Sequence, residues 1–154
     1  MSTLIEDILT QERTLKDVSI SSKKKLLEYL AAFVANQMPN SSASDIFERF
    51  LARERLGSTG IGEGIAIPHC RLSQCQKPLG VLLKLDEAID YDAIDHRPVD
   101  LVFALLVPEQ ADSQHLQVLG MLARNFTDPE YREALRNAPD AQHLYQRALK
   151  APSP

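Results

Sequence analysis

Hydrophobic residues recur every three or four positions over residues 26–34 and again over residues 46–51. This spacing predicts two amphipathic helices, each with one buried face. A serine precedes each helix, one of the pair at 21–22 for the first and Ser42 for the second, where its side chain can cap free backbone amides. Gly57 follows the second helix, and we expect it to form a left-handed C-terminal cap.

Shorter apolar runs predict strands in the middle of the chain. Residues 65–67 and 79–85 are two such runs, and residues 14–20 alternate apolar and polar side chains more weakly. Residues 99–107 are almost entirely apolar, which is typical of a strand covered on both faces. Strands therefore alternate with helices, which predicts an α/β fold with helices layered on a central sheet.

Helical spacing returns in the last third of the chain. Residues 128–137 and 139–150 predict two helices separated by Pro139, because proline breaks a helix interior. Residues 4–9 predict a short amphipathic helical turn at the other end of the chain. Before the last two helices, Asp112 or Ser113 can cap a helix whose buried stripe we expect to comprise Leu116, Leu119, Leu122 and Phe126.

The composition is that of one globular domain. The chain has 154 residues, of which 44% are hydrophobic and 25% are charged. We expect residues 1–150 to form a single domain and residues 151–154 to be a frayed tail. A net charge of −4 argues against nucleic acid as a partner. The N-terminus lacks a signal pattern and no apolar run reaches the roughly 18 residues of a membrane span, so we expect a cytoplasmic protein without a membrane span.

The cysteines give little support to a metal site. Cys70 and Cys75 are the two cysteines of the chain, and so few cysteines fit a reducing compartment. Together with His69 they could suggest zinc, but their spacing matches no standard ligand pattern and a fourth ligand is not evident. We therefore expect no bound metal.

The stretch GSTGIG at residues 57–62 is rich in glycine, which lets backbone amides approach an anion closely. Two nucleotide motifs fail here. A Walker A loop needs Lys and then Ser or Thr where this chain has Glu63 and Gly64, and the dinucleotide fingerprint needs a glycine where Ile65 stands. One small anion suits the loop better, and the alternative is a tight turn that needs positive φ. The candidate phosphate-binding residues are Ser58, Thr59 and Gly60.

His69 follows Pro68 at the end of a predicted strand, where a loop can present its side chain on a rigid scaffold. Neutral imidazole is a nucleophile, and a phosphoryl group on its ring nitrogen would need amides, hydroxyls and a cation nearby. Arg53, on the last turn of the second helix, is the best candidate cation, although an arginine there can also serve only the helix C-terminus. Arg71 is an alternative cation, but we expect it to point the opposite way.

His115 lies in the first turn of the helix that follows the buried strand, on a face that we expect to point inward. Helix starts carry free amides and partial positive charge. His115 could therefore steady a phosphoryl group on His69, or it could be a histidine at the edge of the core with a backbone partner. We expect His96 and His143 at the surface.

The stretch GSTGIGEGIAIPH, which ends at His69, resembles the active-site signature of the enzyme IIA domains of the mannitol/fructose class. These domains belong to the phosphoenolpyruvate-dependent phosphotransferase system. The stretches LARERLGSTGIG, AIDHRPVDLVFALLVP and HLQVLGMLAR follow the order and spacing of that family, so the resemblance covers essentially the whole chain. Within the family, the chain is most similar to the stand-alone nitrogen-regulatory branch.

The resemblance implies a type-2 IIA fold, in which helices flank a mixed central sheet on both faces. It implies that His69 accepts a phosphoryl group on Nε2 from a histidine-phosphorylated carrier of the HPr or NPr type, with no cofactor. His115 would neighbour His69, Arg53 would be the basic residue near the phosphoryl group, and Ser58 and Thr59 would lie in the loop beside it. The phosphorylated and unphosphorylated forms would differ in their binding to potassium transport systems, sensor kinases and other regulators.

Two other functions remain open at this point. A sugar-specific IIA component would pass the phosphoryl group from His69 to a cysteine of a IIB domain, whereas a pure binding module would never be modified there. The chain departs from the family's pattern at Cys70, where many members have Gly or Ala, and at His96, where Asn or Gly is commoner. Cysteine is small and mildly hydrophobic, so we expect Cys70 to leave transfer unaffected.

Overall fold

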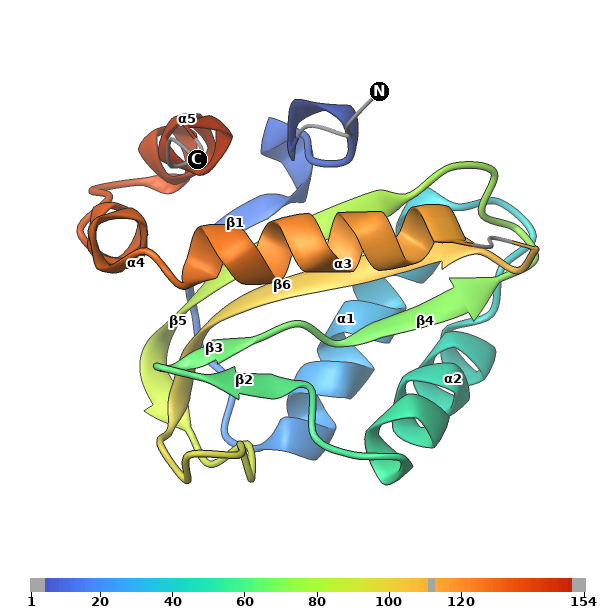
Figure 1. The fold of residues 1–154 in the computed structure, drawn as a ribbon. Helices are drawn as coiled ribbons and strands as arrows, with labels where there is room; N and C mark the ends of the chain where they lie inside the picture. Colours follow the sequence, from blue (N-terminus) through green and yellow to red (C-terminus); the bar gives the residue numbers. More distant parts are fainter. Residues whose placement is uncertain (1–4, 111–112, 151–154) are drawn as a thin grey trace.

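A mixed β-sheet lies at the centre of the protein (Figure 1). The computed structural model describes residues 5–110 and 113–150. Within them the sheet order is β1-β5-β6-β3-β2, and β4 pairs with β6 beside β3. Two pairs, β5 with β6 and β2 with β3, are antiparallel, and the others are parallel. The strands are β1 (Thr14–Val18), β2 (Gly60–Gly62), β3 (Ile65–Ala66), β4 (His69–Leu72), β5 (Leu79–Ile89) and β6 (Val99–Pro108).

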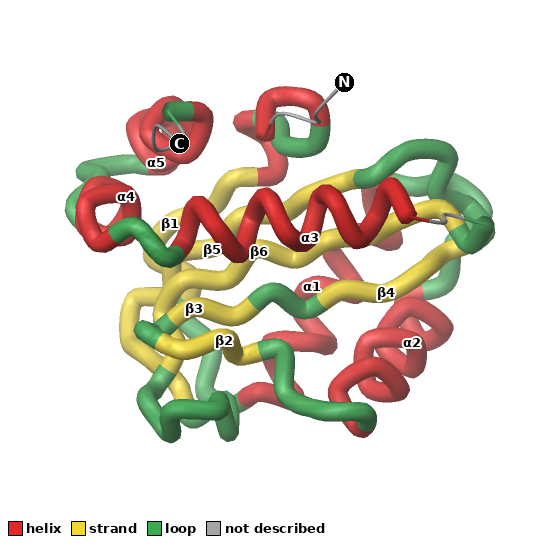
Figure 2. The backbone as a smooth tube through the Cα atoms, viewed as in Figure 1, coloured by secondary structure: helices red, strands yellow, loops and turns green. Residues whose placement is uncertain are grey.

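Helices cover both faces of the sheet, which confirms the predicted fold class (Figure 2). Helices α1 and α2 pack on one face, and α3, α4 and α5 pack on the other face together with η1. Strand β6 is buried along almost its whole length between the two layers, as its apolar sequence predicts. The helices are η1 (Ile5–Asp7) and η2 (Gln11–Arg13), which are 3₁₀ helices, and α1 (Lys23–Gln37), α2 (Ala43–Arg55), α3 (Ser113–Phe126), α4 (Pro129–Arg136) and α5 (Ala141–Leu149).

The predicted N-terminal caps of α1 and α2 are confirmed. The Ser22 hydroxyl accepts a hydrogen bond from the N–H of Lys25 at 3.1 Å, and Ser42 accepts one from Asp45 at 3.3 Å. The C-terminal cap predicted at Gly57 is wrong in its conformation. Its φ is +152°, far from the left-handed helical value of about +57°. The chain therefore leaves α2 in a more extended direction than a left-handed cap would give.

The predicted buried stripe of α3 is confirmed at Leu122 and Phe126, and Leu119 packs partly against the same core, but the prediction is wrong at Leu116. Val118 and Leu122 are fully buried, whereas Leu116 is 62% exposed. Leu116 is in the first turn of the helix and lines the cavity, so the core does not cover it. Asp112, one of the two predicted caps, lies outside the described residues, and Ser113 is the first residue of the helix.

Strands β3 and β4 run one after the other along β6. Ile65 pairs with Leu101, and His69 pairs with Leu105, both in parallel register. Pro68 lies between the two strands and has no N–H to donate, but its carbonyl accepts a hydrogen bond from the N–H of Leu105 at 2.9 Å. His69 therefore begins a strand, whereas the sequence placed it at the end of one.

The glycine-rich stretch is partly a hairpin. Residues 60–62, predicted as loop, form β2 and pair with β3. Glu63 and Gly64 make the turn with φ of +58° and +80°, so a turn that needs positive φ is present here. Gly60 serves close packing instead, because a Cβ atom on it would lie 2.7 Å from the Cβ of Ala93.

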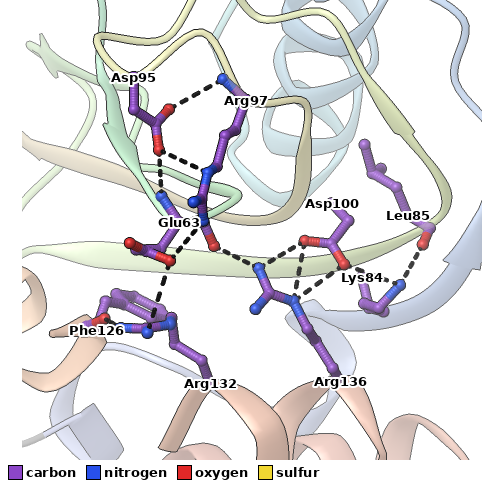
Figure 3. Close-up of polar contacts among 9 residues, drawn as sticks. All are labelled: Glu63, Lys84, Leu85, Asp95, Arg97, Asp100, Phe126, Arg132 and Arg136. Carbon is purple, nitrogen blue, oxygen red and sulfur yellow. Dashed lines mark hydrogen bonds and ion pairs between the residues drawn. The ribbon is translucent and has the colours of Figure 1, made fainter. Parts of the chain in front are cut away.

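Charged side chains hold this hairpin turn against α4 and β6 (Figure 3). Arg136 on α4 donates to the carboxylate of Asp100 on β6, at 2.9 Å and 3.1 Å, and to the carbonyl of Glu63 at 2.6 Å. Arg97 pairs with the Glu63 carboxylate at 3.0 Å, and Asp95 accepts the Glu63 N–H at 2.9 Å. The turn is therefore fixed from two sides.

Candidate active site

A cavity of about 680 Å³ opens between α2, β4 and α3. His69 on β4, Arg53 on α2 and His115 on α3 all line it. Ser58 and Thr59, from the segment that joins α2 to β2, line it as well. The fold thus brings residues from separate parts of the chain around one hollow.

The backbone fixes one side of the His69 imidazole. Its Nδ1 lies 2.7 Å from the carbonyl oxygen of Ile67. A carbonyl oxygen only accepts hydrogen bonds, so Nδ1 carries the proton and Nε2 of the neutral ring keeps its lone pair. The hydrogen-bond geometry thus assigns the tautomer in which Nε2 is unprotonated.

The surroundings of His69 also favour its neutral form. Burial lowers the pKa of His69 below its ordinary value, the hydrogen bond to Ile67 opposes this, and the positive charge of Arg53 lowers the pKa further. The unprotonated imidazole therefore predominates at pH 7. An unprotonated ring nitrogen is the form that can attack a phosphoryl group.

Arg53 contacts both the imidazole and the segment after α2. Its Nε donates a hydrogen bond to Nε2 of His69 at 3.1 Å, and its Nη1 donates to the carbonyl of Gly57 at 2.8 Å. The expected proximity of Arg53 and His69 is confirmed. The contact with the Gly57 carbonyl also fits an arginine that serves the helix C-terminus.

Arg71 does not point away from the cavity, and that expectation is wrong. His69 and Arg71 are two positions apart on β4, so their side chains leave the same face of the strand, and both line the cavity. Nη2 of Arg71 lies 3.4 Å from Nε2 of His115, and its Nη1 donates to the carbonyl of Glu109 at 3.2 Å. His115 is partly buried beside this arginine. His96 and His143 are exposed, as predicted.

The polar groups of residues 58–60 have partners within the chain. The N–H of Gly60 donates to the Ser58 hydroxyl at 3.0 Å. Thr59 is 3% exposed, and both its hydroxyl and its N–H donate to the carboxylate of Glu54. A role for Ser58, Thr59 and Gly60 in holding a phosphoryl group stays a prediction, because these hydrogen bonds would have to be shared or exchanged.

The sequence patterns did not single out two charged residues of α2 that lie at or near the cavity. Glu54 is buried behind Thr59 and pairs with Lys23 at 2.6 Å. Arg49, one helical turn before Arg53, lines the cavity and lies 3.6 Å from the carboxylate of Glu109. The spacing of four residues between the two arginines was the available signal, since such residues share a helix face.

Exposed apolar side chains border the cavity. Leu56 is 84% exposed, Leu116 is 62% exposed and Ile61 is 37% exposed, and all three line the hollow that contains His69. Large apolar side chains that stay exposed around a polar centre are typical of a surface for a protein partner.

The cysteines are buried and unreactive in character. Burial raises the pKa of Cys70 to about 12 and also raises the pKa of Cys75. Cys70 and Cys75 are both free thiols.

Among the described residues, no group of three or more His, Cys, Asp and Glu is arranged to hold a metal ion. In the same part of the chain, no helix is long and apolar enough to cross a membrane.

Comparison with known proteins identifies the family. The sequence profile described as "Phosphoenolpyruvate-dependent sugar phosphotransferase system, EIIA 2" matches residues 7–150. The chain belongs to this EIIA type-2 family. The membership agrees with the resemblance carried by the GSTGIGEGIAIPH stretch and with the mixed sheet covered on both faces.

Two relatives with similar sequences are both called nitrogen regulatory protein. This chain is 51% identical over 142 residues to the nitrogen regulatory protein of Pseudomonas aeruginosa, and the alignment covers 92% of each chain. It is 41% identical over 143 residues to the nitrogen regulatory protein of Escherichia coli, with 92% of this chain and 87% of that protein covered.

Solved structures show the same fold. The nitrogen regulatory protein IIA-Ntr of Neisseria meningitidis superposes with a TM-score of 0.88 at 38% identity, over 95% of this chain and 99% of that one. The mannitol IIA of Escherichia coli superposes with a TM-score of 0.73 at 19% identity, over 91% and 98% of the two chains. The second likeness concerns the fold alone.

Proposed function

We propose that this EIIA protein is a regulatory phosphocarrier whose His69 accepts a phosphoryl group on Nε2. The observation that carries the proposal is the hydrogen bond between Nδ1 of His69 and the Ile67 carbonyl at 2.7 Å, since it leaves the Nε2 lone pair for bond formation. The donor is a histidine-phosphorylated carrier of the HPr or NPr type.

The transfer balances without a cofactor. The lone pair of His69 Nε2 forms the new N–P bond while the N–P bond of the donor phosphohistidine breaks, and the electron pair of the broken bond returns to the donor imidazole. Nδ1 of His69 keeps its proton throughout. Charge on the transferring group is spread over its three equatorial oxygens, so positioning and electrostatics are what the protein must supply.

The cations around His69 suit that task. Arg53 and Arg71 line the cavity with His69, and Arg49 lies further along the same wall. Fixed positive groups in a partly enclosed site stabilise charge that develops on phosphoryl oxygens. His115, which lies beside Arg71, adds a ring nitrogen at the same side of the cavity.

The phosphoryl group would change the surface that partners meet. It adds about two negative charges and strong hydrogen-bond acceptors to the cavity that the exposed side chains of Leu56, Ile61 and Leu116 line. We propose that regulatory partners distinguish the two forms through this patch. Potassium transport systems and sensor kinases are the target classes that the nitrogen-regulatory branch suggests.

The relatives favour regulation over sugar transport. Nitrogen regulatory proteins are 39% to 51% identical to this chain over at least 141 residues, whereas a fructose-specific EIIA component of Haloferax volcanii is 32% identical over 122 residues. A sugar-specific component would pass the phosphoryl group on to a cysteine of a IIB domain. Loss of the phosphoryl group to an added IIB domain at a rate matching its acceptance would favour that alternative.

The direct test is phosphorylation in a purified relay. The protein is incubated with phosphoenolpyruvate, the first enzyme of the system and a phosphocarrier, and its intact mass is measured. We expect a gain of one acid-labile phosphoryl group in the wild type and in His143→Ala, an exposed-histidine control, but none in His69→Ala. A wild type without the gain, or a His69→Ala variant that keeps it, refutes the proposal.

A further inference from the structure

A buried carboxylate lies behind the segment that borders the cavity, and the phosphoryl transfer makes no direct use of it. The side chain of Glu54 is 6% exposed. Donors converge on it from three places: the hydroxyl and N–H of Thr59, the hydroxyl of Tyr91 at 3.1 Å and the ammonium of Lys23 at 2.6 Å. A carboxylate with so many charged and neutral donors holds its surroundings in one geometry.

The donors come from separate elements. Lys23 is the first residue of α1, and its Nζ also lies 4.6 Å from the ring centroid of Tyr91. Tyr91 lies beyond β5, is fully buried, and its hydroxyl is 2.8 Å from that of Thr59. Lys23 supplies the counter-charge for the Glu54 carboxylate, which is largely removed from water. Glu54 thereby connects the end of α2 to Lys23 and to Tyr91.

Hydrogen bonds connect this carboxylate to the imidazole through the backbone of Thr59 and Ile67. The N–H of Thr59 donates to Glu54 at 3.2 Å, and the carbonyl of Thr59 accepts the N–H of Ile67 at 2.9 Å. The carbonyl of Ile67 in turn accepts the proton on Nδ1 of His69 at 2.7 Å. A displacement of Thr59 therefore reaches the group that selects the tautomer of His69.

We propose that Glu54 is a positioning residue for His69, which acts through Thr59 and Ile67 to hold the ring in the tautomer whose Nε2 accepts the phosphoryl group. Its kinetic consequence rests on the proposed function, whereas its effect on the tautomer does not. Arg53 and Glu54 are consecutive in the last turn of α2, and they hold the site from two sides. Arg53 contacts Nε2 directly, and Glu54 controls the Nδ1 side from behind.

The test replaces the carboxylate by an amide of the same size. Glu54→Gln leaves one acceptor oxygen where the carboxylate offers two, so some of the converging donors lose their partner. Glu48→Gln is the matched control, because it makes the same change at an exposed position of the same helix. Two quantities are measured in each protein: the ¹⁵N shifts of the His69 ring nitrogens, which report the tautomer, and the rate of phosphoryl transfer from the phosphocarrier.

We expect the wild type and Glu48→Gln to show a protonated Nδ1 and an unprotonated Nε2. In Glu54→Gln the shifts should move toward a mixture of tautomers, and kcat should fall about tenfold while KM for the phosphocarrier stays within about twofold. A folded Glu54→Gln protein with the wild-type tautomer and kcat overturns the inference. A role limited to stability would lower the unfolding temperature and leave both readouts unchanged, and this also overturns it.

Should Glu54→Gln not fold, Thr59→Val takes its place. Valine has nearly the shape of threonine, so the variant removes the hydroxyl contact to Glu54 and keeps the backbone N–H. A partial shift of the tautomer with a lowered kcat supports the inference, and an unchanged tautomer and kcat overturn it. The NMR comparison needs no phosphoryl donor, so it decides the positioning role even if the wild type is not phosphorylated and the proposed function fails.

Discussion

The Nε atom of Arg53 lies 3.1 Å from Nε2 of His69 and donates a hydrogen bond to its lone pair, although the two residues are 16 positions apart in the sequence. In the proposed transfer, that lone pair forms the N–P bond. The proposal therefore requires Arg53 to exchange its contact with the nitrogen for a contact with a phosphoryl oxygen during transfer. The same side chain contacts the resting imidazole and, in the proposed function, would stabilise the transferred group.

Replacing Arg53 by alanine should slow phosphorylation of His69 about a hundredfold, because one fixed donor to the developing charge is lost. Arg55→Ala, two positions along the same helix at an exposed site, should stay near the wild-type rate. Rapid-quench measurement of phosphoryl transfer from the phosphocarrier checks both variants. Equal rates of phosphorylation in the two variants would mean that Arg53 serves only the C-terminus of the helix.

Stability should depend on pH through His69. Burial lowers the pKa of His69 in the folded protein, whereas a histidine in the unfolded chain titrates near about 6.5. As the pH falls below about 6.5, the unfolded chain binds a proton on His69 before the folded protein does. The free energy of unfolding therefore falls with pH until the lower pKa of the folded protein is reached. Urea unfolding measures the free energy of unfolding of the wild type and of His69→Gln. Between about pH 7.5 and about pH 5.5, the value for the wild type should fall relative to that of the variant as the pH is lowered. A difference that does not change with pH contradicts this.

Arg136→Ala should lower the free energy of unfolding by about 1.5–3 kcal/mol, because Arg136 makes charge-assisted hydrogen bonds to Asp100 in a partly buried site. Arg97→Ala removes an arginine of the same cluster whose side chain is 63% exposed, and it should cost less than about 0.5 kcal/mol. Chemical denaturation of the two variants checks the contrast. Similar losses in both would mean that burial does not decide the strength of these contacts.

The two thiols should resist modification in the folded protein. Burial raises the pKa of Cys70 to about 12, so almost no thiolate exists at neutral pH, and Sγ of Cys75 donates to the carbonyl of Lys77 at 2.8 Å. We expect iodoacetamide to label neither residue at a measurable rate until urea unfolds the chain. Intact mass after timed labelling follows the reaction, and rapid labelling of Cys70 in the native protein would contradict this prediction.

Local patterns in the sequence determined much of the fold. Serine caps placed the starts of α1 and α2, and the apolar run at 99–107 predicted the strand that both helical layers cover. These features depend on neighbours within a few positions, which share one backbone conformation. The motif around His69 also marked the candidate site, because a rigid backbone, small residues and a histidine occur together there.

Contacts between distant elements were decided only by the tertiary structure. The sequence placed Arg71 away from the cavity, yet the pleat of β4 puts it beside His69. Leu116 looked buried, but the packing of α3 on the sheet leaves it at the cavity mouth. The sequence offered no sign that Glu54 would join Lys23 and Tyr91, because sheet order and helix packing, which no local pattern encodes, bring those residues together.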